Sequence, residues 1–461
     1  MSSTPISSNH IRSRFSRAMS AMYRHEVPAY GSLLDLVREV NEATLAGDDV
    51  EKQRLAALGE LDRISEERHG AIRLGTAHEL STMRRLFAVM GMDPVGYYDL
   101  SVAGVPVHST AFRPVDEEAL RANPFRVFTS LLRLDLIDDP MLRSEAARVL
   151  AERRIFTDGC LALIERAETE GGLDEADASA FVAEALETFR WHPDANVDHD
   201  LYKCLHDAHR LVADVVAFKG PHINHLTPRT LDIDAVQRLM PAWGIKPKAV
   251  IEGPPTRRVP ILLRQTSFKA LEEPVTYSNG ETTVAGSHTA RFGEIEQRGL
   301  AVTPKGQALY DRLLNETRAI VRPAADGSNA DEYMATLAKT FEAFPDDLGE
   351  IRRQGLGYFR YSVADKPASP IAPSAGTEDL IAAGVLRADP IVYEDFLPVS
   401  AAGIFQSNLG DEAAQAFAAN PNRERFEADL GTPVIDLQRC YAETEAASLA
   451  RARADLAQET V

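Results

Sequence analysis

Two segments that carry histidines have the residue types from which a metal site could be built. Residues 221–230 read PHINHLTPRT. In an extended strand, His222 and His225 would point to opposite faces, so only one of them could enter a cavity directly. His69 begins a second segment that reads as a strand, residues 69–74, and each segment is followed by a helical pattern. Because one histidine supplies one ligand and a site needs several, we predict that the two segments meet.

A third segment, residues 292–299 (FGEIEQRG), could supply a carboxylate. Glu294 and Glu296 are two residues apart and would share one strand face, and His288 falls on the same face. Periodicity alone does not choose among them. Each residue also has an ordinary interpretation, because a strand histidine is commonly a hydrogen-bonded core residue and a glutamate is commonly half of an ion pair.

Two neutral imidazoles and one carboxylate are the ligand set of non-haem Fe(II) oxygenases, in which other coordination positions stay open. A 2-oxo acid could fill two of the open positions through its carboxylate and keto oxygens, and dioxygen could take another. The residue types therefore make oxidative decarboxylation of a 2-oxo acid feasible.

An arginine lies on the same predicted strand face as the first histidine. Arg73 follows His69 by four residues, about 13 Å along a strand at about 3.3 Å per residue. Its guanidinium could hold a substrate carboxylate through two parallel hydrogen bonds. A surface ion pair with Glu66 or Glu67 is the alternative.

Two similar modules must position these side chains. In the first, the strand at 69–74 precedes a helix at 77–90, which stops at Gly91, and strands at 94–102 and 105–113. In the second, the histidine strand precedes a helix at 235–243 and strands at 248–252, 260–271 and 289–297. We predict an α+β fold in which two βαβββ-like modules form a curved sheet around the metal. Three residues of the strand at 260–271 could donate hydrogen bonds to the metal ligands, and no motif ranks one above the others. They are Arg264, Gln265 and Ser267.

Consecutive helical patterns separate the modules. They cover residues 141–156, 160–170, 175–189 and 199–218, an insertion of about 80 residues. We predict that residues 1–461 are a single catalytic unit with four parts. The parts are the N-terminal helices with the first module (1–135), the helical insertion (136–220), the second module (221–300), and a helical and extended region that completes the pocket (301–461).

The composition argues against several partners. The chain has a net charge of −19 and a pI near 5.1, without the clustered Lys and Arg that bind nucleic-acid phosphates. No apolar run approaches the roughly 20 residues that span a bilayer. Three scattered cysteines, Cys160, Cys204 and Cys440, are too few for a disulfide framework. We therefore expect a cytoplasmic protein with no nucleic-acid or membrane partner, and the sequence predicts no oligomeric state.

Several motifs resemble known enzymes. Residues 223–227 (INHLT) and 292–298 (FGEIEQR) resemble the first and last strands of the metal-binding module in vicinal oxygen chelate enzymes, including 4-hydroxyphenylpyruvate dioxygenase. Four segments resemble the 2-oxoadipate dioxygenase/decarboxylase family more closely and run over nearly the whole chain: residues 67–73 (ERHGAIR), 222–232 (HINHLTPRTLD), 288–294 (HTARFGE) and 398–405 (PVSAAGIF).

The resemblance implies specific roles for residues that the pattern leaves open. It implies that His69, His225 and Glu294 bind Fe(2+), and that Arg73 is the substrate-binding arginine of the HGAIR motif. It also implies that Val399 and Ser400 line the substrate pocket. His222 would then be a packing residue or a residue that supports a ligand.

The resemblance further implies that the protein converts 2-oxoadipate and O2 to (R)-2-hydroxyglutarate and CO2, in lysine catabolism. Its partners would be a small 2-oxo dicarboxylic acid and O2. A lyase or isomerase of the vicinal oxygen chelate superfamily, which uses Zn, Ni or Mn as a Lewis acid on a small carbonyl compound, is an alternative. A catalytically silent metabolite-binding protein is a third.

Overall fold

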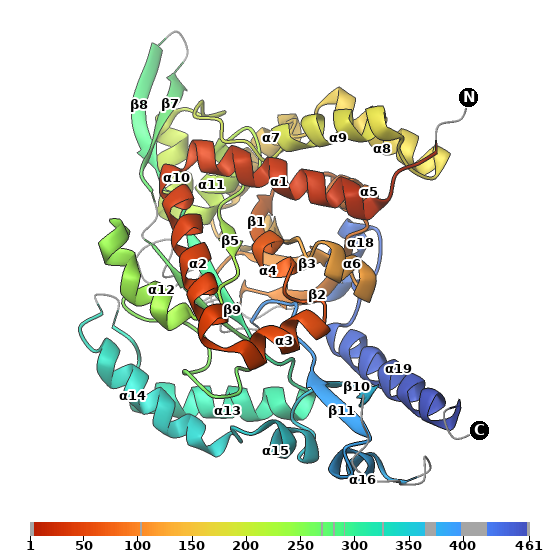
Figure 1. The fold of residues 1–461 in the computed structure, drawn as a ribbon. Coiled ribbons are helices and arrows are strands. Elements are labelled where there is room, and N and C mark those ends of the chain that lie inside the picture. Colours follow the sequence, from red (N-terminus) through yellow and green to blue (C-terminus); the bar gives the residue numbers. More distant parts are fainter. Residues whose placement is uncertain are drawn as a thin grey trace. The chain divides into compact units, whose positions relative to one another are not determined.

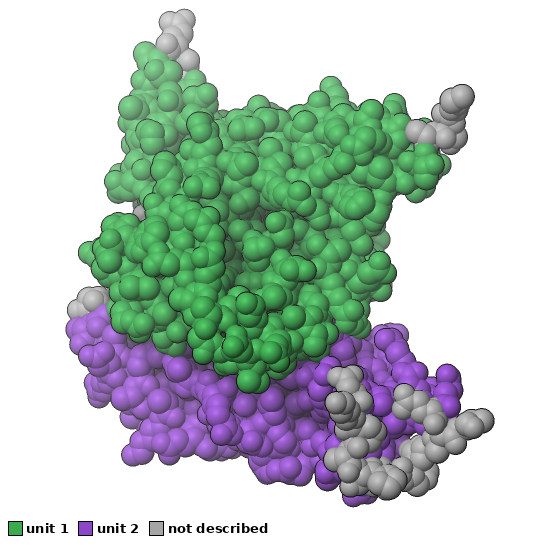
Figure 2. Space-filling model, viewed as in Figure 1, with its two compact units in different colours: residues 1–251, 265–297, 396–434 green, residues 252–264, 298–395, 435–461 purple. Residues whose placement is uncertain are grey.

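The computed structural model describes residues 4–101, 104–268, 271–279, 282–289, 291–324, 327–364, 375–397 and 422–458. The chain divides into two compact units, coloured separately in Figure 2. Unit 1 comprises residues 1–251, 265–297 and 396–434, and unit 2 comprises residues 252–264, 298–395 and 435–461.

The first βαβββ module lies in unit 1. Its elements are β1 (Arg68–Leu74), α5 (Ala77–Val89), β2 (Asp93–Asp99), β3 (Val107–Arg113) and β4 (Arg126–Leu132). Thr76 caps the start of α5 by accepting a hydrogen bond from the backbone N–H of Glu79 at 3.1 Å, and Gly91 follows its end at φ +64°. The predicted helix and the strands around it are confirmed, and β4 is an additional strand.

The central sheet places the ends of several strands next to the first histidine. Its strand order is β2-β3-β4-β1-β5, where β5 is Leu226–Pro228. His69 pairs with Arg126 on the parallel neighbour β4 and with Thr227 on the antiparallel neighbour β5. Residues that pair across neighbouring strands project to the same face, so these three side chains lie in a row.

The second module is shorter and less regular than predicted. It consists of β5, α12 (Ile233–Leu239), β6 (Leu263–Ser267) and β9 (Glu294–Arg298), and β6 pairs with β9. A parallel bridge between Arg229 and Glu296 continues from β5, which mirrors the parallel pairing of β1 with β4. The overall class is α+β, with one βαβββ module, a second module of the same kind that is shorter by one strand, and large helical insertions.

Two predictions for the second module were wrong in detail, and one hairpin was not predicted. Residues 221–225 are not a regular strand: the N–H of Ile223 donates to the carbonyl of Phe189, and that of Asn224 donates to the carbonyl of Ala71 in β1, one residue out of register with the β1–β5 pairing. Residues 248–252 form no strand. The segment before β9 instead forms an antiparallel hairpin of β7 (Glu273–Asn279) and β8 (Thr282–His288).

Helices make up most of the remainder of unit 1 (Figure 1). Those outside the insertion are α1 (Ser8–Glu26), α2 (Pro28–Gly47), α3 (Asp49–Ala57), α4 (Arg63–Glu66), α6 (Glu117–Ala122) and α18 (Arg423–Leu430), with short 3-10 turns η2 (Leu134–Leu136) and η3 (Met240–Trp243). The insertion contains α7 (Pro140–Glu152), α8 (Asp158–Glu170), α9 (Glu175–Glu187), α10 (His199–Ala208) and α11 (Arg210–Ala217). The last predicted helix divides at His209, whose backbone is extended and whose ring caps α11.

The two faces of β1 belong to different hydrophobic clusters. Ile72 and Leu74 pack into one cluster with α1, α2 and α5. Ala71, which shares its face with His69 and Arg73, packs into the other with Phe128 and the apolar residues of α11. Helices α7, α10 and α11 of the insertion therefore pack in the cluster on the sheet face that carries the candidate chemistry, whereas α8 and α9 pack in the other cluster.

Unit 2 consists of helices around a small sheet. Its elements are α13 (Pro304–Ile320), α14 (Ala330–Thr340), η4 (Phe341–Ala343), α15 (Leu348–Arg353), β10 (Phe359–Val363), α16 (Thr377–Ala382), β11 (Leu386–Pro390) and α19 (Leu437–Gln458). Strands β10 and β11 pair antiparallel, and α19 packs against β10. Across the described ranges of both units, no helix has the length and apolar character to cross a membrane.

Candidate metal centre

The structure brings two histidines and one glutamate together in unit 1. His69 is the second residue of β1, His225 immediately precedes β5, and Glu294 is the first residue of β9. All three side chains are buried. One potential ligand atom from each lies within 4.8 Å of the other two.

The separations of these atoms suit a common metal ion. His69 Nε2 lies 3.0 Å from Glu294 Oε1, and His225 Nε2 lies 3.7 Å from the same oxygen. Two ligand atoms at about 2.1 Å from a metal and at right angles to each other would be about 3 Å apart. Within the described ranges, neither ring nitrogen of His225 has a hydrogen-bond partner. A buried polar nitrogen without a partner is costly, so a metal cation fits this set of donors.

Two neighbouring side chains orient Glu294. Its Oε1 accepts hydrogen bonds from Thr227 Oγ1 at 3.1 Å and from Gln265 Nε2 at 2.9 Å. Gln265 was one of three unranked candidates in the sequence. Arg264 donates instead to the backbone carbonyl of Pro254 at 3.0 Å.

Burial and charge act differently on the three donors. Burial lowers the pKa of His225 to about 4, with Glu294 opposing the shift, which favours a neutral imidazole. Burial alone would raise the pKa of Glu294, but the adjacent histidines outweigh it and hold the pKa below its usual value. Burial would likewise lower the pKa of His69, but the carboxylates of Glu296 and Glu294 raise it above its usual value. A neutral imidazole and an ionised carboxylate are the forms that bind metals.

The residues that sequence periodicity left as alternatives have other partners. His222 Nε2 and His288 Nε2 lie 3.2 Å and 2.9 Å from the same oxygen of Asp214. Glu296 faces the far nitrogen of His69, with its Oε2 at 2.9 Å from Nδ1. In the described part of the chain, the only group of three or more donors with metal-binding spacing is the one formed by His69, His225 and Glu294.

Arg73 is buried and paired with a residue of the helical insertion. Its Nη1 lies 2.6 Å from Asp214 Oδ2 on α11. With the Asn224 amide oriented to satisfy both of its groups, its oxygen accepts a bond from the same Nη1 at 3.1 Å. Burial would raise the pKa of Asp214, but Arg73 and the two histidines hold it well below its usual value. The alternative of a surface ion pair with Glu66 or Glu67 was wrong.

Sequence reasoning missed two residues that shape the site. Asp214 follows Arg73 by 141 positions, and the sequence around it in α11 does not indicate which residue it pairs with. Thr227 could have been found, since it belongs to the INHLT motif and alternates with His225.

Two predicted pocket residues, Val399 and Ser400, lie outside the described residues. Phe396, three positions before Val399, packs edge-on against the His69 ring with centroids 4.9 Å apart. A cavity of about 270 Å³ elsewhere in unit 1 is lined by Gly75, His108, Arg133 and others, but by none of the three donors. We therefore do not assign the substrate to that cavity.

Known proteins resemble the chain over nearly its full length. The family model described as 2-oxoadipate dioxygenase/decarboxylase matches residues 15–408. The 2-oxoadipate dioxygenase/decarboxylase of Pseudomonas putida is 60% identical over 447 residues, covering 96% of each chain. The protein of the same name from Escherichia coli is 56% identical over 449 residues, covering 97% of this chain and 98% of its own. A crystal structure of hydroxyglutarate synthase from Pseudomonas putida in complex with 2-oxoadipate superposes with a TM-score of 0.90 at 59% identity, covering 97% of this chain and 98% of the other.

Proposed function

Because the chain belongs to the 2-oxoadipate dioxygenase/decarboxylase family, we propose that it uses Fe(II) to convert 2-oxoadipate and O2 to 2-hydroxyglutarate and CO2. The observation that carries the proposal is the convergence of His69, His225 and Glu294 at one buried point. Two imidazoles and one carboxylate are the ligand set of non-haem iron oxygenases.

The proposed reaction balances without an external reductant. A six-carbon keto diacid gains two oxygen atoms and loses one CO2, which leaves a five-carbon hydroxy diacid. Oxidative decarboxylation supplies two of the four electrons that reduce O2, and hydroxylation of the carbon next to the new carboxylate supplies the other two. Iron, when bound, would supply the redox chemistry that activates O2.

The side chains of this protein would hold the reactants and exclude water. The three donors are at most 4% exposed, so reactants bound there would be shielded from bulk solvent. Thr227 and Gln265 would keep the Glu294 carboxylate oriented toward the metal through their hydrogen bonds.

Arg73 would bind one carboxylate of the substrate. It lies on the same face of β1 as His69, and Asp214 and Asn224 both bond its Nη1. The hydrogen bonds described for Arg73 all involve Nη1, so Nη2 and Nε would be the donors to a substrate carboxylate. Because Asp214 fixes one end of the guanidinium, the remaining donors would be oriented before the substrate arrives.

Val399 and Ser400 would line the same pocket and limit the substrate length. The support is the resemblance of residues 398–405 to the family motif, together with the contact between Phe396 and His69 a few positions earlier.

We also propose that residues 1–461 act as one catalytic unit in the cytoplasm. The family match spans residues of both compact units. Cys160 and Cys204 are free thiols, which suits a reducing compartment.

Oxygen consumption tests the proposed reaction. The protein would be loaded with Fe(II) under anaerobic conditions, and O2 uptake, CO2 release and 2-hydroxyglutarate would then be measured with 2-oxoadipate and, separately, with 2-oxoglutarate. We expect equal amounts of O2 consumed and CO2 released with 2-oxoadipate, and a slower reaction with the shorter acid. Turnover of a carbonyl compound without O2 uptake would instead assign the protein to the lyases or isomerases.

A further inference from the structure

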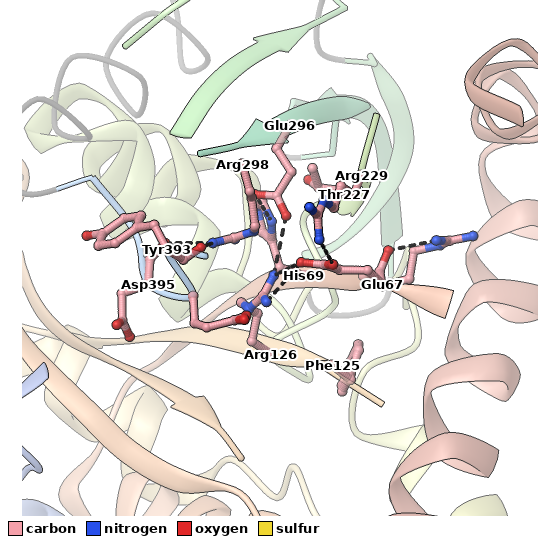
Figure 3. Close-up of polar contacts among 12 residues, drawn as sticks. Glu67, His69, Phe125, Arg126, Thr227, Arg229, Glu296, Arg298, Tyr393 and Asp395 are labelled. Carbon is pink, nitrogen blue, oxygen red and sulfur yellow. Dashed lines mark hydrogen bonds and ion pairs between the residues drawn. The ribbon is translucent and has the colours of Figure 1, made fainter. Parts of the chain in front are cut away.

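Two buried glutamates of β9 approach opposite sides of one imidazole. Glu294 and Glu296 are two positions apart and share a strand face. Glu294 Oε1 lies 3.0 Å from His69 Nε2, whereas Glu296 Oε2 lies 2.9 Å from His69 Nδ1. The contact with Glu294 is on the Nε2 side of the ring, so Glu296 lies on the opposite, Nδ1 side. Figure 3 draws Glu296 next to His69.

We propose that Glu296 is a positioning residue that fixes the tautomer and the orientation of His69. A neutral imidazole carries one N–H and one lone pair. If Nδ1–H donates to Glu296, the lone pair on Nε2 is directed toward the metal. Histidines that bind metals commonly donate their other N–H to a carboxylate in this way. The inference rests on the metal site of the proposed function and adds a role that the ligand set does not include.

The contact is within hydrogen-bond distance, although the N–H of the ring is not aligned with the carboxylate oxygen. The His69 ring packs edge-on against Phe396 and against the His225 ring, with centroids 4.9 Å and 5.3 Å apart. Packing therefore restricts where the ring lies, and the carboxylate would select which nitrogen faces the donors.

His225 provides a contrast within the same site. Neither of its nitrogens has a hydrogen-bond partner in the described part of the chain. Its ring is held by packing against Phe292, with centroids 4.8 Å apart, and against His69. Of the two histidine ligands, only His69 therefore has a carboxylate next to the ring nitrogen that faces away from the metal donors.

Glu296 is itself held from several directions. Its other oxygen, Oε1, lies 3.4 Å from Arg126 Nη1, and its backbone carbonyl accepts from the N–H of Thr230 at 2.8 Å. Both terminal nitrogens of Arg126 also donate to Glu67 Oε1 at 3.0 Å, and Glu67 Oε2 accepts from Arg229 at 2.9 Å. This series of alternating charges, drawn in Figure 3, keeps the carboxylate of Glu296 in place next to His69.

A purely structural role for Glu296 makes a different prediction from a positioning role. If the residue only neutralises Arg126, its removal would lower the stability of the metal-free protein and leave the metal affinity of the folded protein unchanged. If it positions His69, the metal affinity and the ligand geometry must change as well.

Co(II) provides a direct probe, because its visible absorption reports coordination geometry. We would measure the Co(II) dissociation constant of Glu296→Ala, Glu296→Gln and the wild type by competition with a chelator, with thermal unfolding of each metal-free protein. We expect Co(II) binding to weaken by about 10- to 100-fold in Glu296→Ala, with an altered absorption spectrum. Glu296→Gln keeps an acceptor of similar shape and should lose less, about threefold, because a hydrogen bond to a charged acceptor is roughly twice as strong as one to a neutral acceptor.

Glu79→Gln is a matched control. Glu79 is also buried, and both of its oxygens pair with Arg153, at 2.8 Å and 2.6 Å, away from the three donors. Glu79→Gln should lose stability but keep the wild-type affinity for Co(II).

If both Glu296 variants bound Co(II) with the wild-type constant and spectrum, the positioning role would be wrong while the metal site would stand. If the wild type itself failed to bind Co(II), the proposed function would fail first. Should Glu296→Ala not fold, Glu296→Gln alone decides between the outcomes.

Discussion

At the scale of single residues, each of the three donors comes from a different segment, so replacing one leaves the other two in place. We predict that His69→Ala, His225→Ala and Glu294→Ala each lose most bound iron and nearly all turnover, because the ligands act together. Iron content after anaerobic loading and gel filtration measures the effect. The fold should survive, as tested by circular dichroism.

His222→Ala is the matched control for these variants. His222 is as buried as His225 but lies against Asp214 rather than the donors. It should retain iron. If His222→Ala lost the metal while His225→Ala kept it, the assignment of the histidine ligand would be reversed.

Arg73 tests the substrate and not the metal. We predict that Arg73→Lys keeps near wild-type iron, because Arg73 bonds Asp214 and Asn224 rather than the donors. A substrate carboxylate left without its guanidinium partner would lose roughly 2 to 5 kcal/mol. Turnover of 2-oxoadipate should therefore fall by about 30-fold or more. The lysine side chain keeps the positive charge but cannot reproduce the planar pair of donors, so it should restore little of the lost turnover.

Steady-state kinetics with 2-oxoadipate, together with iron analysis, measures the Arg73 effect. Normal turnover by an iron-loaded Arg73→Lys protein would rule out the role. Arg264 and Arg291 are then the next arginines to test. Arg291 pairs with Glu273 and Glu26, and Arg264 donates to a backbone carbonyl, whereas Arg73 shares the strand face of the metal donor His69.

At the scale of elements, the sequence predicted the first module better than the second. Helix α5 has apolar residues at helical spacing, a threonine cap and a glycine stop, and all of these signals are local. Strand β4 was missed because every residue from Arg126 to Leu132 is buried, so its sequence shows no alternation of apolar and polar residues. Residues 221–225 alternate as a strand should, but Ile223 bonds Phe189 of the insertion, and Asn224 meets β1 out of register with the pairing of β5.

The candidate site shows the same division between local and distant information. The strand period correctly places Glu294 and Glu296 on one face, but it does not say which of the two meets His225. That depends on how β9 lies relative to β5, a contact between segments about 70 residues apart. The pairing of Arg73 with Asp214 depends on how the helical insertion folds back over the sheet, which no local pattern encodes.

Gly70 tests how closely the loop that carries His225 approaches β1. A Cβ at Gly70 would lie 2.5 Å from Ile223 Cδ1 and 3.1 Å from the backbone carbonyl oxygen of His225. The isoleucine side chain can move, but the carbonyl is fixed by the chain. We predict that Gly70→Ala displaces residues 223–225, lowers stability by about 1 to 3 kcal/mol and weakens Co(II) binding.

Chemical denaturation and Co(II) titration measure these two effects of Gly70→Ala. Gly47→Ala is the control, because a Cβ at Gly47, at the end of α2, meets nothing within 4 Å. It should be neutral or slightly stabilising and bind Co(II) normally. Wild-type stability and affinity in Gly70→Ala would mean that the loop can move away without disturbing His225.

At the scale of the whole molecule, a buried histidine couples the stability of the fold to pH. His108 lies on β3, with its Nδ1 3.5 Å from the Tyr97 hydroxyl and its ring edge-on to Phe426. Burial lowers its pKa to about 4, and Arg133 acts in the same direction. The charged groups around it are Arg133 and Arg425, which lower the pKa, and Asp99 and Asp135, which raise it.

The sign of the effect follows from proton binding. Between the ordinary histidine pKa of about 6.5 and a folded-state pKa of about 4, the unfolded chain binds the proton and the folded chain does not, so stability falls as the pH falls. We predict that His108 alone lowers the unfolding free energy by about 2 kcal/mol between pH 7 and pH 5.

Urea denaturation of the wild type and of His108→Gln at both pH values measures this loss. The wild type should lose about 2 kcal/mol more than the variant, while His25→Gln, at an exposed position near the end of α1, should follow the wild type. Equal losses in the wild type and in His108→Gln would mean that the folded protein accommodates a protonated His108.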